Sequence, residues 1–127
     1  MSKITLSTPG FSSEFVNFIK KNDFHDAEIE FVRSIYITKD EKIKEIKDLA
    51  EKLGVTLSIH APYFINLASL DETILKRSID IIVECCVVGD KLGVKYICFH
   101  PGYYQKRDEK EVYKIVKRSI LEIKKKI

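Results

Sequence analysis

The sequence lacks the apolar segments that would place the protein in or across a membrane. No run of about 18 apolar residues occurs anywhere in the 127 residues, so we expect no membrane-spanning helix. The N-terminus, Met-Ser-Lys-Ile-Thr-Leu-Ser, does not contain the apolar core of a signal peptide. The sequence therefore predicts no membrane partner and a cytoplasmic location.

Cysteine is scarce, and the motifs of several common chemistries are missing. Cys85 and Cys86 are adjacent in an expected helix and Cys98 lies in an expected strand, without the spacing of a zinc finger or a CxxC motif. We therefore expect buried, reduced thiols. No glycine-rich phosphate loop is present, nor a spacing typical of a Ser/His/Asp or Cys/His nucleophile, so these routes to nucleotide binding and covalent catalysis are not indicated.

The charge of the chain is nearly balanced. The 22 basic and 19 acidic residues give a net charge of +3, which neither requires nor excludes a nucleic-acid partner. The basic excess falls late in the chain, at Lys117, Arg118 and residues 124–126. We interpret this cluster as the solvated face of a helix.

The hydrophobic pattern predicts four strands that alternate with four helices in one domain. Strands are expected at residues 3–8, 27–31, 55–60 and 96–100. The helices are expected to run from a cap at Ser12 or Ser13 to about residue 22, from a cap at Thr38 or Asp40 to residue 53, from Asp71 or Thr73 to about residue 92, and from near Asp108 to the end. Strands joined through helices are parallel.

All four strands alternate between apolar and polar residues, whereas central strands of a doubly wound sheet are apolar on both faces. A (βα)8 barrel explains this pattern, because one face of its sheet packs on helices and the other lines the interior. A full barrel needs about 250 residues and eight units. The fold class predicted is α/β, with residues 1–127 forming the (βα)4 N-terminal half of a TIM barrel that lacks strands five to eight.

Two strands end in the same way, with a histidine that a proline follows closely. His60 ends the third strand before Ala61-Pro62, and His100 ends the fourth before Pro101-Gly102. At the carboxyl ends of adjacent strands their imidazoles can converge on one metal ion, such as zinc. Alternatively, each histidine only hydrogen-bonds the backbone. A catalytic zinc normally takes three protein ligands, so at least one further ligand is needed.

Glu28 and Glu30 face the expected barrel interior, where an unpaired charge is costly. Glu30 is the nearer to the carboxyl end of its strand and is a weak candidate for a catalytic base or a metal ligand. The pattern favours the alternative that it pairs with a lysine or accepts a hydrogen bond behind the metal ligands.

Loops at the same edge of the sheet carry candidate binding residues. Arg33 can hold a phosphate bidentately, and Tyr63 and Phe64 can stack on or wedge between bases. The aromatic loop can equally be a lid that packs on itself. Residues 103–107, Tyr-Tyr-Gln-Lys-Arg, can touch an anion, but we expect a solvated loop.

Three segments together resemble the N-terminal half of endonuclease IV, the metal-dependent apurinic/apyrimidinic endonuclease with a barrel fold, most of all its archaeal members. The segments are residues 28–33 (EIEFVR), 60–67 (HAPYFINL) and 99–102 (FHPG). The resemblance implies that His60 and His100 bind one metal of a trinuclear zinc cluster. It also implies that Tyr63 and Phe64 enter the minor groove of DNA, with Arg33 inserted beside them.

The implied activity is DNA repair: hydrolysis of the phosphodiester 5′ to an abasic site in double-stranded DNA by a metal-activated hydroxide. The family's other ligands lie on strands five to eight, so we expect this half alone to be inactive and to bind zinc weakly. A sugar isomerase or epimerase barrel and a non-catalytic assembly module are the alternatives. We also predict a homodimer through the open edges of the half-barrel.

Overall fold

A computed structural model describes residues 7–12 and 15–127, and it confirms the predicted fold class. In this part of the chain the strands form one parallel sheet in the order β1-β2-β3-β4. The strands are β1 (Ser7–Pro9), β2 (Asp26–Glu30), β3 (Thr56–His60) and β4 (Tyr96–Cys98). A helix follows each strand, as in half of a (βα)8 barrel.

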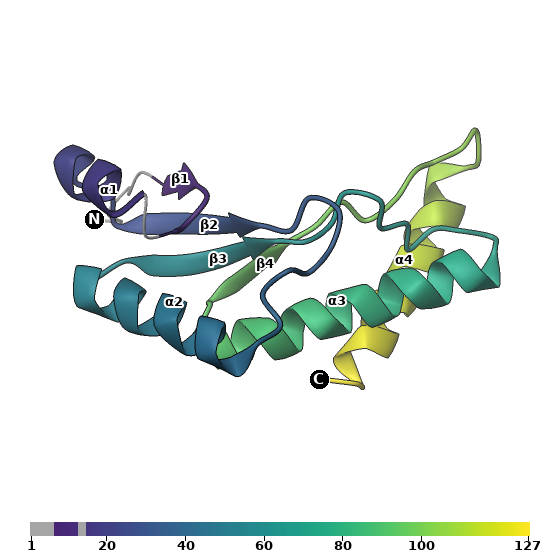
Figure 1. Cartoon of the computed structure of the whole chain (residues 1–127). Coiled ribbons are helices and arrows are strands. Elements are labelled where there is room, and N and C mark those ends of the chain that lie inside the picture. Colours follow the sequence, from purple (N-terminus) through teal and green to yellow (C-terminus); the bar gives the residue numbers. More distant parts are fainter. Residues whose placement is uncertain (1–6, 13–14) are drawn as a thin grey trace.

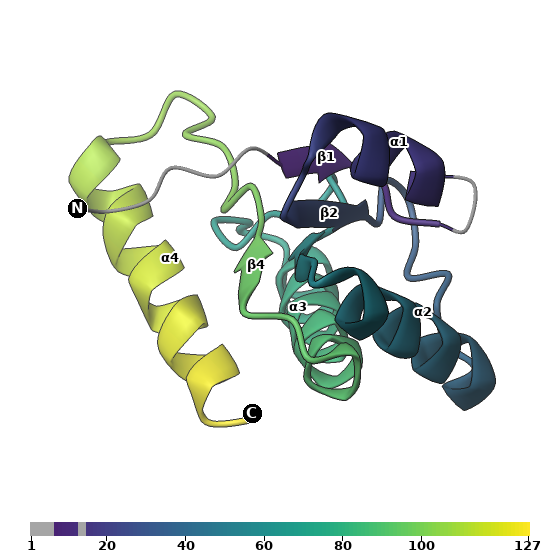
Figure 2. The same cartoon turned by 90° about the vertical axis from the view of Figure 1, so that its left-hand side faces the viewer.

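The helices are α1 (Val16–Asn22), α2 (Asp40–Leu53), α3 (Glu72–Leu92) and α4 (Glu109–Lys124). Figure 1 shows α2 and α3 along the same side of the sheet, and Figure 2 shows α4 beyond β4, on the opposite side of the molecule from α1 and α2. None of the helices in the described residues is long and apolar enough to cross a membrane.

Several helix ends follow the predicted signals. The side chains of Asp71 and Asp108 cap α3 and α4 by accepting hydrogen bonds from N–H groups of the first turn. Gly54 and Gly93 end α2 and α3 in the left-handed conformation that favours glycine (φ 66° and 73°).

Two other predicted caps are wrong. α1 begins only at Val16, and Phe15 precedes it without a side-chain cap. Ser12 instead accepts a hydrogen bond with its backbone carbonyl in the turn before the helix. Ser13 lies outside the described residues. α2 follows Lys39, also without a side-chain cap, so neither Thr38 nor Asp40 is the N-cap of this helix. Of the strand predicted at residues 3–8, residues 3–6 are likewise outside the described part.

The hydrophobic core lies on the face of the sheet that the helices cover. Ala27, Ile29, Leu57 and Ile59 alternate along β2 and β3 and are almost fully buried there. The alternate residues lie on the opposite face, where Glu28 and Ser58 are half-buried and Glu30 is exposed. We call this opposite side the concave face, because it corresponds to the interior of a complete barrel.

The apolar pattern of α3 predicts a buried face, and this prediction is partly wrong. The face predicted is Ile74, Leu75, Ile79, Ile82, Val83, Cys86, Val87 and Leu92. Ile74 and Val87 are exposed, and Cys85 and Val88 are buried instead. The buried stripe follows the helical period through Ile79, Ile82, Cys85 and Leu92, and Val87 lies outside it. Of the thiols expected to be buried, Cys98 is exposed, because it lies on the concave face of β4.

Candidate metal and nucleic-acid site

His60 and His100 lie side by side at the carboxyl edge of the sheet. His60 is the last residue of β3, as predicted. β4 ends at Cys98, so the prediction that His100 ends the fourth strand is wrong, and His100 follows β4 by two residues. Their ring centroids are 5.2 Å apart with an angle of 53° between the planes. The predicted juxtaposition is confirmed, and the distance is short enough for both imidazoles to reach one ion at Zn–N bonds of about 2.0–2.1 Å after small rotamer changes.

The hydrogen bond of His60 selects the nitrogen that is free for a metal. Its Nδ1 lies 3.0 Å from the carbonyl oxygen of Ala61. A carbonyl only accepts, so Nδ1 carries the proton in this contact and Nε2 keeps its lone pair. Metal-binding histidines are commonly oriented in this way, through the ring nitrogen that does not bind the metal.

Glu30 and Cys98 flank His60 on the neighbouring strands. The register pairs Glu30 with His60 and His60 with Cys98, so the three side chains form a row across the concave face. Burial raises the pKa of Tyr36, and the nearby carboxylate of Glu30 raises it further. Glu30 makes no ion pair with a lysine among the described residues.

The donor set on this edge is incomplete. Within the described ranges 7–12 and 15–127, no group of three or more His, Cys, Asp or Glu side chains is close enough together to hold a metal ion. The two imidazoles fit two positions in the coordination shell of zinc, and their role as metal ligands stays a prediction. His25, the third histidine, lies just before β2 and therefore at the opposite end of the sheet.

The loops that follow the two histidines are locked together by backbone contacts. The N–H of Leu67 donates to the carbonyl of Pro101 at 2.8 Å. Gly102 has a φ of +143°, and a Cβ atom there would lie 2.5 Å from Oδ1 of Asn66 and 3.2 Å from the backbone nitrogen of Ala68. Only glycine fits this position, which gives a physical reason for the Pro-Gly pair after His100.

Arg107 adds a second link between these loops and corrects the expectation of a wholly solvated loop. Its Nη2 donates to the carbonyl of Ala68 at 2.6 Å, and its Nε donates to the carbonyl of Tyr104 at 3.3 Å. Arg107 is half-buried, whereas Gln105 and Lys106 are exposed. The contacts of Arg107 and Gly102 between the two loops were not predicted from the sequence. The glycine that follows Pro101 was the one feature of the sequence that indicated them.

The candidate DNA-binding residues lie on neighbouring loops. The N–H of Tyr63 points to the carbonyl of Val32 at 3.4 Å, so the loops after β2 and β3 run side by side. Tyr63 is 50% exposed and Phe64 is half-buried, with their rings nearly perpendicular and 6.0 Å apart. Arg33 is exposed. The two rings therefore contact each other while half of the Tyr63 side chain stays exposed, and both the DNA contact and the lid stay predictions.

Sequence reasoning also missed Arg77 on α3. Its guanidinium carbon lies 5.5 Å from the centre of the Phe64 ring, within the range of a cation–π contact. Nothing in the sequence indicated this partner, because it is on the helix that follows the loop and not in either loop motif.

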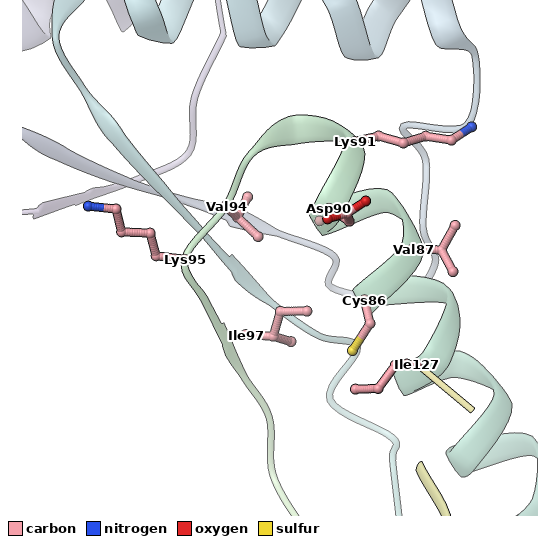
Figure 3. Close-up of a pocket in the computed structure, with 9 residues that line it drawn as sticks. Cys86, Val87, Asp90, Lys91, Val94, Lys95, Ile97 and Ile127 are labelled. Carbon is pink, nitrogen blue, oxygen red and sulfur yellow. The ribbon is translucent and has the colours of Figure 1, made fainter. Parts of the chain in front are cut away.

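A larger hollow is unrelated to this edge. It has a volume of about 550 Å³ and lies between the end of α3, the start of β4 and the C-terminal residue, as Figure 3 shows. Its lining is mainly apolar and includes Cys86, Val87, Val94, Ile97 and Ile127. Neither histidine of the pair contributes to it.

The four parallel βα units and the strand-end histidines define the chain as half of a (βα)8 barrel with chemistry-bearing residues at its carboxyl edge. The chain belongs to the xylose isomerase-like TIM barrel family, whose model matches residues 16–127. The resemblance to endonuclease IV is confirmed by several relatives with the name "Probable endonuclease 4".

Individual relatives match at modest identity. An uncharacterized protein of Methanocaldococcus jannaschii is 34% identical over 108 residues, covering 85% of this chain and 38% of the relative. A "Probable endonuclease 4" of Aquifex aeolicus is 31% identical over 86 residues, covering 68% of this chain and 29% of the relative. The crystal structure of a D-tagatose 3-epimerase-like protein superposes with a TM-score of 0.77 at 20% identity, covering 97% of this chain and 48% of that one.

The chain is shorter than the proteins that it matches. It spans less than half the length of each of these three proteins. At 20% identity the epimerase-like structure shows the fold alone.

Proposed function

We propose that this chain supplies one half of the active site of a zinc-dependent, endonuclease IV-like phosphodiesterase that acts on abasic double-stranded DNA. The observation that carries the proposal is the pair of imidazoles 5.2 Å apart at the carboxyl edge of the sheet. The proposal includes the cytoplasmic location expected from the sequence.

The chain's own residues would hold and surround the metal. Nε2 of His60 is oriented by the contact of Nδ1 with Ala61, and the imidazole of His100 approaches from the neighbouring strand. Glu30 stands beside His60 in the register, in a position to accept a proton or a hydrogen bond. Zinc, when bound, supplies a hydroxide at neutral pH and stabilises charge on the phosphate. The further ligands would come from the second half of the barrel.

The loops beside the histidines support a nucleic-acid substrate. Tyr63 projects an exposed ring that can fill the space of a missing base, and Arg33 on the adjacent loop can bind a phosphate. An epimerase or isomerase acting on a free sugar is the second candidate, since the same fold carries that activity in the structural neighbours. An enzyme for a small sugar has no need of an exposed tyrosine and arginine outside its barrel.

The free edges of the half-barrel support the proposed homodimer. Pro9 has no N–H to donate, which is typical of an edge strand and makes β1 the weaker edge for pairing. The edge at β4 lies beside the apolar hollow of Figure 3, where Val87 and Ile127 are exposed. Sedimentation at micromolar concentration tests this assembly, and a stable monomer would refute it.

Zinc titration by calorimetry tests the metal site. We expect weak binding by the chain, and loss of most of it in His60→Ala and in His100→Ala, because each variant leaves one imidazole. His25→Ala is the matched control, since this histidine lies at the other end of the sheet. Binding that survives both site variants would move the metal elsewhere.

Duplexes with and without one abasic site test the substrate. We expect the abasic duplex to bind more tightly, and Tyr63→Ala to reduce this preference. Equal binding of both duplexes would contradict the proposed substrate. Cleavage by the purified 127-residue chain would overturn the view that a second half is required.

A further inference from the structure

A second, smaller hollow lies on the outer side of the loops that carry Tyr63 and Arg33. Its volume is about 250 Å³, and it is formed by the loop after β2, the loop after β3 and the middle of α3. It is lined by Arg33, Ser34, Ile35, Pro62, Phe64, Arg77, Ile81 and Glu84. Two arginines, one from the loop after β2 and one from α3, therefore line the same hollow.

Both guanidinium groups lack an ionic partner within the described part of the chain. Neither Arg33 nor Arg77 has a carboxylate oxygen within 4.0 Å, although several exposed lysines do. Glu84 also lines the hollow, but it is seven residues beyond Arg77 on α3, which corresponds to about 10 Å along the helix axis. The lining of the hollow therefore holds two guanidinium groups and one carboxylate.

The contact of Arg77 with Phe64 leaves its hydrogen-bonding edge free. A guanidinium that lies over an aromatic ring keeps its five N–H donors in its own plane, available to a planar or tetrahedral anion. Phe64 in turn contacts Tyr63 edge-on. The series Arg77, Phe64 and Tyr63 therefore connects the hollow to the exposed ring proposed to enter the DNA.

We propose that this hollow binds one phosphate of the DNA backbone between Arg33 and Arg77, with the hydroxyl of Ser34 as a further donor. Phosphate is the anion that paired arginines recognise best, and a backbone phosphate fixes the position of a duplex without reading its sequence. The inference rests on the proposed function, because it names a second contact for the same substrate. It assigns DNA binding to Arg77, a residue outside the loop motifs.

The salt dependence of duplex binding separates a phosphate contact from a purely structural role of Arg77. Each neutralised phosphate contributes a slope of about −0.9 to a plot of log affinity against log salt concentration. We expect Arg77→Ala to reduce affinity roughly 10-fold at low salt and to reduce the slope by about one unit. The loss should be equal for intact and abasic duplexes, since both have the same backbone.

Two variants serve as controls. Arg118→Ala removes the same charge from an exposed position on α4 and should leave the slope unchanged. Phe64→Leu removes the aromatic partner but keeps both arginines. If Arg77 acts only by supporting Phe64, Arg77→Ala will match Phe64→Leu and leave the slope unchanged, which would overturn the proposal.

A measurement without DNA distinguishes failure of the proposed function from failure of the proposed phosphate site. If the chain does not prefer abasic DNA, the proposed function fails, but an altered slope in Arg77→Ala still supports the phosphate contact. If the chain binds no duplex, dimethyl phosphate, a phosphodiester, is titrated while the Nε–H signals of the arginines are followed by NMR. Shifts at Arg33 and Arg77 support the site; no shift, or shifts with inorganic phosphate only, would overturn it.

Discussion

The two faces of the sheet differ in what they contribute to the molecule. On the helix-covered face Ile29, Leu57 and Ile59 are almost completely buried, whereas on the concave face Tyr96 is 70% exposed and His60 is half-buried. Both sets of residues come from the same short strands. Along each strand, residues whose burial stabilises the fold therefore alternate with residues that are available for binding or catalysis.

This division has an energetic basis. Burial of a large aliphatic side chain contributes about 1.5–3 kcal/mol, while a half-exposed polar group on a solvated face contributes little. The helix-covered face can therefore hold the half-barrel together without help from the concave face. The concave face is free to carry histidines, carboxylates and a thiol that a dry core would not accept.

The largest difference between the faces should appear in the reactivity of their thiols. Cys98 on the concave face is exposed, and Cys85 on the inner face of α3 is fully buried. We expect a thiol reagent at pH 8 to label Cys98 about 10³-fold or more faster than Cys85, which reacts only through opening of the fold. Mass spectrometry of the labelled peptides measures the ratio. Similar rates would show that α3 is not packed as described.

The pH dependence of stability provides a second measurement on the same thiol. Burial raises the pKa of Cys85 from 9.0 to about 12. The unfolded chain therefore loses this proton at lower pH than the folded chain, and the free energy of unfolding should fall as the pH rises from about 9 towards 12. Cys85→Ala removes this part of the slope, and Cys98→Ala should leave it unchanged.

The next largest effect is expected from a truncation on each face of β3. Ile59→Ala should reduce the free energy of unfolding by about 2–5 kcal/mol, because it leaves a cavity against α3. Ser58→Ala, one residue earlier on the concave face, should change it by about 0.5 kcal/mol or less. Urea denaturation of both variants checks the pair. A comparable loss in Ser58→Ala would mean that the concave face is covered in solution.

The sequence was sufficient to predict most of the fold, because the fold depends on periodicity. Alternation placed Ile29, Ile59 and His60 on the correct faces, and the glycines at positions 54 and 93 marked the ends of two helices. Alternation also agrees with the position of Cys98 on the concave face, and only the general expectation of buried thiols was wrong for it. The helical apolar pattern was wrong for Val87, which it assigned to the buried face of α3. Both lie beside parts of the half-barrel that no other element of the described chain covers.

The candidate site was predictable only where it had a local motif. His60 ends β3 and His100 lies two residues beyond β4, so their convergence follows from parallel neighbours in the sheet. Arg77 and Arg107 act on loops that are distant in sequence, through a ring contact and through backbone carbonyls. No single-sequence pattern indicates such partners, because they depend on how helices and loops pack.

The smallest of the expected effects tests whether the carboxyl edge is an exception to the loose packing of the concave side. Gly102→Ala places a Cβ within 2.5 Å of Oδ1 of Asn66, at a φ of +143° that disfavours other residues. We expect a loss of about 1–3 kcal/mol in the free energy of unfolding. We also expect weaker zinc binding, since Pro101-Gly102 holds the His100 loop against residues 66–68.

Gly54→Ala is the matched control: its φ is also positive, at +66°, but nothing lies within 4 Å of the added Cβ. It should therefore cost some stability without changing zinc affinity. If both variants weaken stability and zinc binding equally, the contact between the two histidine loops does not order the site, and the edge is as loosely held as the rest of the concave face.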